Sequence, residues 1–215
     1  MEREAAIERI RLLIGQDLVP LASQYNVTIW KSPGKKNKGW AGHVIERYLG
    51  LPINSAQSPN FGSWELKVVP VKRSRKGLVV KETMAITMID PVYVAQTPFE
   101  SCHLLSKLQK MVVVARIFEN VDEPRSILYS AGVFDLSDAK LYETVRQDYE
   151  NVRKVIAEKG FNALTGKMGI LVQPRTKGQG HGSTSRAFYA RTRFVSHILG
   201  VKLLDSLPLE LSETT

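Results

Sequence analysis

Residues 58–67 read Ser-Pro-Asn-Phe-Gly-Ser-Trp-Glu-Leu-Lys. A proline and a glycine near its start are turn residues, and the sequence from Trp64 onward is that of an apolar strand. Side chains alternate between the two faces of a strand, so Glu65 and Lys67 point to one side while Leu66 enters the core. The turn would bring Asn60 alongside residue 65. The segment therefore predicts a strand that gathers an amide, a carboxylate and an ammonium group.

An acidic residue and a lysine at this spacing are typical of centres that hydrolyse phosphodiester bonds with a divalent metal ion. The ion neutralises charge on the phosphate and lowers the pKa of the attacking water, so the protein must supply oxygen ligands. Glu65 and the backbone carbonyl of Leu66 can supply two of them. On its own the Glu-x-Lys spacing is weak evidence, because charges of both signs alternate on many exposed strands.

Other segments extend the pattern. Residues 38–50 read Lys-Gly-Trp-Ala-Gly-His-Val-Ile-Glu-Arg-Tyr-Leu-Gly, residues 81–83 read Lys-Glu-Thr, and residues 101–108 read Ser-Cys-His-Leu-Leu-Ser-Lys-Leu. With Trp-Glu-Leu-Lys and the last third of the chain, these segments resemble the MutH mismatch-repair endonucleases and related restriction enzymes that cut at GATC. The resemblance covers most of residues 36–200. It implies an α/β, restriction-endonuclease-like PD-(D/E)xK fold, in which helices flank a mixed central sheet.

The resemblance also implies a site. Its catalytic group would consist of Glu46 on a helix, Asn60, Glu65, Lys67 and Lys107. Asn60, Glu65 and the carbonyl of Leu66 would hold a magnesium ion. Without the other motif members, Glu46 would be interpreted as a solvated helix residue and Lys107 as an ordinary surface lysine.

Asn60 departs from the family's pattern, in which an aspartate completes a carboxylate pair. An amide can offer one oxygen but no charge, so metal affinity and turnover should both fall. Three explanations are open: the residue was altered to trap an uncut complex, the natural protein works with a weaker site, or the protein binds DNA without cutting. We favour the first, because every other catalytic position matches.

The composition favours a polyanionic partner. The 215 residues include 30 Lys and Arg against 21 Asp and Glu, which gives a net charge of +9. Basic residues cluster near residues 35–38, 72–76 and 175–193, as expected of a track for double-stranded DNA. A hydrophobic content of 43% fits one globular domain. We expect one MutH-like domain over residues 1–205 and a polar tail over 206–215, acting as a monomer or a transient homodimer.

Cysteine usage and the N-terminal sequence bear on the compartment. The single Cys102 excludes an internal disulfide and a cysteine-rich zinc site, and the four histidines lack metal-ligand spacing. The N-terminal residues are charged and contain no apolar stretch long enough for a signal or a membrane anchor. We expect a cytoplasmic protein that does not interact with membranes.

Apolar periodicity predicts the main elements. Helices are expected over about 2–14, 42–49, 104–110, 138–159 and 192–199, with Ser137 as the cap of the longest one and Gly160 as its end. Strands are expected over about 64–71, 79–89, 111–118 and 169–173. The β-branched run at residues 112–114 indicates a buried central strand. The glycine-rich basic segment 174–183 predicts an irregular loop.

In the resembled family, the segment after the penultimate strand enters the major groove, and a later Phe-Tyr pair contacts bases or senses adenine methylation. The DNA-contacting candidates here are Lys38, Gln173, Arg175, Lys177, Arg186 and Tyr189. The repair enzymes' Arg-Pro-Lys is replaced by Gln-Pro-Arg at residues 173–175. Arginine pairs with guanine and glutamine with adenine, so GATC specificity cannot be carried over directly. The alternative for Tyr189 is a core aromatic residue.

Three functions are therefore open. The first is a restriction-type endonuclease that cuts at a short GATC-like site. The second is a MutH-type mismatch-repair nickase that a partner protein activates. The third is a DNA-binding protein without turnover. The charge of +9 and the altered recognition triplet slightly favour the first, although the chain length and single-domain build fit the second equally well.

Overall fold

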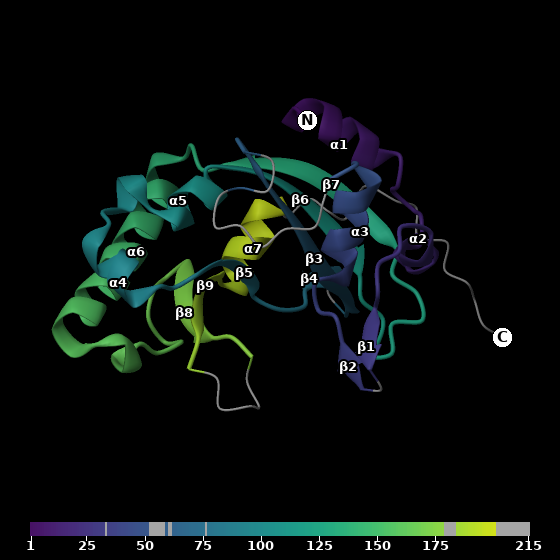
Figure 1. Ribbon diagram of the computed structural model, residues 1–215. Helices are drawn as coiled ribbons and strands as arrows, with labels where there is room; N and C mark the ends of the chain where they lie inside the picture. The colour runs from purple at the N-terminus through teal and green to yellow at the C-terminus, as the bar shows by residue number, and fades with distance from the viewer. Residues whose placement is uncertain (33, 52–58, 60–61, 76, 179–183, 201–215) are drawn as a thin grey trace.

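The computed structural model describes residues 1–32, 34–51, 59, 62–75, 77–178 and 184–200. Asn60, most of the glycine-rich loop after residue 178 and the expected polar tail therefore lie outside the described residues. The described part is a mixed α/β fold in which helices flank a central sheet (Figure 1). The predicted fold class is confirmed. Among the helices of this part, none is long and apolar enough to cross a membrane.

The larger sheet has the strand order β4-β3-β6-β7. Its two inner strands, β3 (Glu65–Ser74) and β6 (Lys110–Ile117), run parallel, with Glu65 opposite Met111. The outer strands, β4 (Gly77–Val80) and β7 (Leu128–Asp135), are antiparallel to their neighbours. Every residue of β6 after Lys110 is buried, which confirms the predicted central strand.

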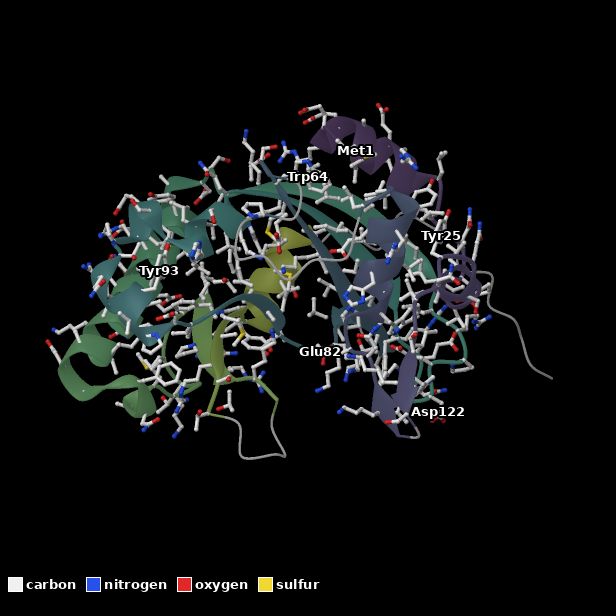
Figure 2. All side chains as sticks on the ribbon, viewed as in Figure 1. Met1, Tyr25, Trp64, Glu82, Tyr93 and Asp122 are labelled. Carbon is white, nitrogen blue, oxygen red and sulfur yellow. The ribbon has the colours of Figure 1, made fainter. Side chains whose placement is uncertain are left out.

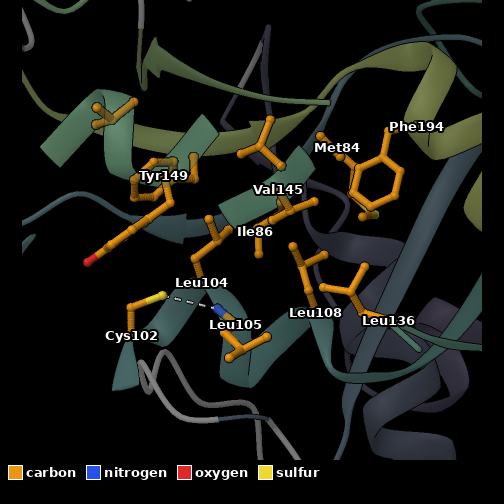
Figure 3. Packing of buried hydrophobic residues seen from close by; sticks show 14 of the residues in the cluster. Met84, Ile86, Cys102, Leu104, Leu105, Leu108, Leu136, Val145, Tyr149 and Phe194 are labelled. Atoms are coloured by element: carbon orange, nitrogen blue, oxygen red, sulfur yellow. Dashed lines mark hydrogen bonds between the residues drawn. The ribbon is translucent and has the colours of Figure 1, made fainter. Parts of the chain in front are cut away.

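Alternation along β3 and β6 sorts their side chains onto two faces. Leu66 and Val112 pack with α1 (Arg3–Arg11), α2 (Leu18–Gln24) and α3 (Trp40–Tyr48). Met111 and Val113 belong to the cluster on the other face, which includes α5 (His103–Leu108) and α6 (Ala139–Lys159). Figure 3 shows part of this second cluster, with side chains from several elements in contact. Glu65 and Lys67 alternate with Leu66 along β3, so their side chains lie on the face of the sheet that carries the second cluster.

The smaller sheet has the order β5-β9-β8 and is antiparallel throughout. It consists of β5 (Met84–Met88), β9 (Arg186–Ala190) and β8 (Val172–Thr176). In Figure 1 it lies on the left with α4 (Pro91–Gln96) and α6, while α7 (Thr192–Ile198) lies between the two sheets. A short hairpin of β1 (Trp30–Ser32) and β2 (Lys35–Lys36) projects at the lower right.

Four expectations about the elements were wrong. The segment 174–183 was expected to be irregular, but residues 174–176 belong to a strand, β8, and pair with β9. The strand expected over 79–89 is two strands in different sheets, β4 in the larger sheet and β5 in the smaller one. After β4 the Lys81 N–H still donates to the carbonyl of Pro70 on β3, and the chain then leaves the larger sheet. The cap of α6 is Asp138, whose carboxylate accepts from the N–H of Leu141 at 2.8 Å, and not Ser137. The strand expected from residue 169 begins at Val172.

Asp148 explains why β8 begins late. This α6 residue is 5% exposed, and its carboxylate accepts the successive N–H groups of Ile170, Leu171 and Val172 at 2.6, 2.7 and 2.8 Å. Those donors would otherwise be available to a strand partner. Asp148 thereby fixes the entry into β8, the strand that carries residues 173 and 175.

We expect Asp148→Ala to lower the free energy of unfolding by about 3 kcal/mol, because up to three backbone N–H groups lose their acceptor. Urea unfolding followed by circular dichroism measures the loss. Asp148→Asn keeps one acceptor oxygen and should lose less. Glu158→Ala, at an exposed position of the same helix, serves as the control and should change stability by less than about 0.5 kcal/mol. Equal losses for Asp148→Ala and the control would contradict the assigned role.

Candidate active site

Three of the predicted catalytic residues meet at the start of β3. Glu65 is 1% exposed, and its Oε1 lies 2.7 Å from the Nζ of Lys67 and 3.4 Å from the Nζ of Lys107. Lys67 comes from the same face of the same strand, and Lys107 from the last turn of α5. One carboxylate oxygen therefore lies between two ammonium groups that come from separate elements.

Lys107 is buried, with 6% of its surface exposed. Its helix is held by Leu104, Leu105 and Leu108, and the helix begins where the Cys102 Sγ accepts the N–H of Leu105 at 3.3 Å (Figure 3). Burial lowers the pKa of Lys107, the carboxylate of Glu65 opposes that shift, and the neighbouring Lys67 adds to it. The alternative of an ordinary surface lysine is therefore wrong.

The cluster has an excess of positive charge, since two ammonium groups share one carboxylate. Lys177, an exposed residue directly after β8, adds to the positive potential that lowers the pKa of Lys107. The loop that follows β8 thus begins within electrostatic reach of Glu65 and its lysines. Such a cluster is suited to a negatively charged phosphate group.

We expect Lys107→Met to raise the free energy of unfolding by about 1 kcal/mol, because replacing a buried charge by an apolar side chain of similar shape is often stabilising. Glu65 would keep Lys67 as its partner. The pKa of Lys107 is lowered in the folded state, so its charge destabilises the folded protein at neutral pH. As the pH rises through the lowered pKa toward 10.5, Lys107 loses its proton and this destabilisation disappears. The gain should therefore shrink over that range.

Urea unfolding at pH 7 and again near pH 10 tests both parts of this expectation. Lys110→Met is the matched control, because Lys110 is exposed at the start of β6. A destabilised Lys107→Met protein, or a gain that grows with pH, would contradict the assignment of Lys107 as a buried charge that opposes folding.

Glu46 lies on α3 and is buried, with 7% of its surface exposed. The interpretation as a solvated helix residue is therefore wrong. Its helix packs on the face of β3 that carries Leu66, whereas Glu65 and Lys67 lie on the opposite face. Glu46 thus lies on a helix at the face of β3 opposite to the side chains of Glu65 and Lys67, and its membership in the catalytic group stays a proposal.

The expected metal ligands are only partly among the described residues. Glu65 provides a buried carboxylate and Leu66 a neighbouring backbone carbonyl, which are oxygen donors of the kind that magnesium prefers. Asn60 lies outside the described part of the chain. Within that part, no group of three or more His, Cys, Asp and Glu side chains could hold a metal ion. The donor set fits a weak site, in which a cation must compete with two lysines for Glu65.

Arg175 and Tyr189 form a pair on the smaller sheet. The Arg175 guanidinium lies 5.7 Å from the centre of the Tyr189 ring and donates to the Thr83 hydroxyl at 2.8 Å. Arg175 is exposed, and Tyr189 is half-buried, so the alternative of a core aromatic residue does not describe Tyr189. Its pKa is raised by burial, against the effect of Arg175. Thr83 was not predicted as part of this group, since only the sheet brings it to Arg175.

The other DNA-contacting candidates differ in their accessibility. Gln173 is only 5% exposed, so its side chain is in the interior. Arg186 is half-buried, lies over the Phe161 ring at 5.5 Å and donates to the carbonyl of Asn162 at 3.4 Å. Lys38 is exposed directly before α3. Lys38, Arg175 and Lys177 are therefore the candidates with exposed charge.

Comparison with known proteins confirms the expected resemblance. The family model of MutH, described as DNA mismatch repair enzyme MutH, matches residues 49–150. A DNA mismatch repair protein MutH from Vibrio campbellii is 24% identical over 209 residues, which cover 90% of this chain and 91% of that protein. This chain is therefore similar to MutH proteins over most of its length.

Two further relatives agree with this result. The MutH protein of a Shewanella species is 25% identical over 90% of the MutH-like chain and 92% of its own length. The MutH protein of Haemophilus ducreyi is 26% identical over 87% of this chain and 88% of its own length. A solved structure, the restriction endonuclease MvaI in complex with cognate DNA, is 12% identical with a TM-score of 0.40, and the alignment covers 92% of this chain and 97% of that one.

Proposed function

We propose that this MutH-like chain is a magnesium-dependent DNA endonuclease of restriction type, which hydrolyses phosphodiester bonds at a short, GATC-like site. The observation that supports this most directly is the convergence of Glu65, Lys67 and Lys107 on one buried carboxylate oxygen. Two ammonium groups around one carboxylate form a positively charged cluster, and such a cluster can bind the anionic phosphate of a nucleic-acid backbone.

The residues would divide the work as follows. Glu65, the Leu66 carbonyl and residue 60 would hold magnesium, which neutralises phosphate charge and favours ionisation of a nearby water. Lys67 would orient or deprotonate the attacking water. Lys107 would stabilise the negative charge that grows on the phosphate oxygens. Glu46 would hold Lys67 in place or assist a second ion, a role that requires its carboxylate to reach past the start of β3 from the opposite face.

DNA would lie across the exposed basic residues Lys38, Arg175 and Lys177, with Tyr189 beside Arg175. Arg175 is suited to a guanine, because its guanidinium group can donate two hydrogen bonds, one to each major-groove acceptor of that base. Gln173 and Arg186 would take part only after their side chains turn outward. A DNA substrate and one buried thiol, Cys102, favour a cytoplasmic setting.

The second candidate is a MutH-type nickase that a mismatch-repair partner activates. The sequence relatives favour it, because they carry the name of a DNA mismatch repair protein and align over about nine-tenths of this chain. One catalytic group breaks one strand in each binding event. A double-strand cut by this chain would therefore require a transient homodimer or a second binding event.

Supercoiled plasmid separates these functions. The Asn60→Asp protein is incubated with plasmid and magnesium in the absence of other proteins, and the products are resolved on an agarose gel. Linear DNA supports the restriction enzyme, and open circles support the nickase. Plasmid that stays supercoiled at protein concentrations that retard it on the gel would contradict an endonuclease and leave a DNA-binding protein.

A further inference from the structure

The β1–β2 hairpin presents an exposed tryptophan among lysines. Trp30 is 42% exposed, whereas Trp40 and Trp64, the other tryptophans of the chain, are 0% and 1% exposed. Lys31 and Lys35, which flank the turn of the hairpin, are exposed as well. The sequence has no acidic residue between Asp17 and Glu46. This hairpin surface is therefore basic and aromatic.

Lys36 holds the hairpin in place. Its Nζ lies 5.0 Å from the centre of the Trp30 ring, donates to the carbonyl of Val121 at 3.2 Å and pairs with Glu123 at 2.5 Å. The last two residues belong to the loop between β6 and β7. Asp122, in the same loop, is labelled beside the hairpin in Figure 2. Since the Lys36 ammonium is directed to Glu123 and the Val121 carbonyl, the exposed lysines of the hairpin are Lys31 and Lys35.

Glu123 connects the hairpin to the body of the protein. Its buried carboxylate, 3% exposed, also accepts from the indole N–H of Trp40 at 2.9 Å and from Arg116 at 2.7 Å. Burial opposes ionisation, but the bonds from Lys36, Arg116 and Trp40 keep the pKa of Glu123 below its usual value. Its backbone φ of 43° lies in the left-handed region, which is costly for a residue other than glycine. The conformation is thus held by the contacts of its side chain.

We propose that the β1–β2 hairpin is a DNA-contacting arm, in which Trp30 packs against the duplex and Lys31 and Lys35 contact phosphates. The proposal rests on the proposed function and extends its DNA surface beyond Lys38, which follows β2 by two residues. Lysines that contact phosphates supply sequence-independent affinity for duplex DNA, and an aromatic side chain beside them adds apolar contact area.

Charge complementarity selects DNA as the occupant. A protein partner generally presents both signs of charge, whereas the hairpin itself offers only ammonium groups around an indole. The neighbouring β6–β7 loop carries two exposed acidic residues, Asp122 and Glu119, and the carboxylate of Glu119 is paired with Arg125 at 2.7 Å. The buried Glu123 is already occupied by three donors. The hairpin is also held in place before any partner binds, so less conformational entropy is lost on contact.

Tryptophan fluorescence tests the contact directly, because Trp30 is the accessible one of the three indoles. We use the native chain, a duplex oligonucleotide in EDTA and the neutral quencher acrylamide. Saturating DNA should lower the quenching constant to nearly that of the Trp30→Phe protein, which should itself respond little to DNA. Fluorescence anisotropy of a labelled duplex reports binding independently.

The results distinguish a failure of the proposed arm from a failure of the proposed function. An unchanged quenching constant on DNA that anisotropy shows to be bound would overturn the arm and leave the proposed function intact. Absence of any binding at low salt would overturn both. Trp30→Ala should weaken binding by about tenfold, because the duplex would no longer cover a large apolar side chain, whereas wild-type affinity for this variant would contradict the packing of Trp30.

The lysines are tested by a matched pair of double variants. Lys31→Gln/Lys35→Gln should lower the slope of log Kd against log salt by one to two, since each lost phosphate contact removes about 0.9. The control Lys140→Gln/Lys154→Gln makes the same charge change at exposed positions of α6, on the other side of the molecule (Figure 1). Equal slopes for the two double variants would show a general charge effect and overturn the assigned contacts.

Discussion

Replacing Lys67 by alanine, in a protein that carries aspartate at position 60, is expected to reduce DNA cleavage by about 10²–10⁴-fold, the range for losing a positioned proton-transfer group. The Lys67 ammonium lies 2.7 Å from the Glu65 carboxylate, so it is next to the expected metal ligand. Single-turnover cleavage of a labelled duplex with magnesium measures the rate of the chemical step.

DNA affinity should be almost unchanged by Lys67→Ala, because this lysine acts at one phosphate while the exposed basic residues hold the duplex. Lys154→Ala is the control. Lys154 is exposed on α6 and lies outside the basic clusters of the sequence. Retained cleavage in the Lys67→Ala protein would refute the role given to this lysine. A parallel loss of affinity and rate would instead indicate that Lys67 only binds DNA.

The second large effect is expected at residue 60. Asn60→Asp should tighten the binding of a divalent cation by at least about tenfold, because it adds a charged oxygen ligand to the carboxylate of Glu65 and changes of metal-site partners commonly alter affinity by 10–100-fold. Isothermal titration of the metal-free proteins with calcium, which occupies oxygen sites without supporting the chemistry, measures the affinity.

Asn151→Asp makes the same chemical change at an exposed position of α6 and should leave cation binding unaltered. The double variant Asn60→Asp/Glu65→Gln should bind the cation no more tightly than the native protein, because its site again has one carboxylate. Equal cation affinities of the native and Asn60→Asp proteins would contradict the placement of residue 60 among the ligands, and with it the interpretation of Asn60 as an inactivating residue.

The two inner strands of the larger sheet could be predicted because their patterns are local, whereas β7 and β9 were not predicted. The β-branched run at 112–114 and the strand that starts near Trp64 were both expected in the central sheet, and the structure places them side by side. The alternation that separates Leu66 from Glu65 and Lys67 follows from strand geometry alone. The resemblance to MutH added Lys107, which no local pattern indicates.

Contacts between distant residues set the limit of the sequence interpretation. The burial of Lys107 and Glu46 depends on how α5 and α3 pack against β3, which periodicity does not fix. Gln173 looked like a base-contacting residue but is buried, because β8 has α6 packed against it. Glu123 had no signal in the sequence, since two of its three donors, Trp40 and Lys36, come from the N-terminal part of the chain.

The expected catalytic group was likewise recovered in part. Lys67 and Lys107 both contact Glu65, and these are three of the four side chains, with Asn60, that the nuclease interpretation places in one pocket. Glu46 is buried on the helix at the opposite face of β3, and Asn60 lies outside the described residues. The roles of all five residues in cleavage stay predictions that the variants above address.

The central claim is that a DNA-cleaving centre is built around Glu65 and lacks full activity because residue 60 is an amide. Its most direct test is the initial rate of supercoiled plasmid loss with magnesium, measured side by side for the native and Asn60→Asp proteins. We predict a rate at least about 100-fold higher for Asn60→Asp, and no loss of plasmid in EDTA. Equal rates for the two proteins, or plasmid that stays intact with both while bound, would contradict the claim.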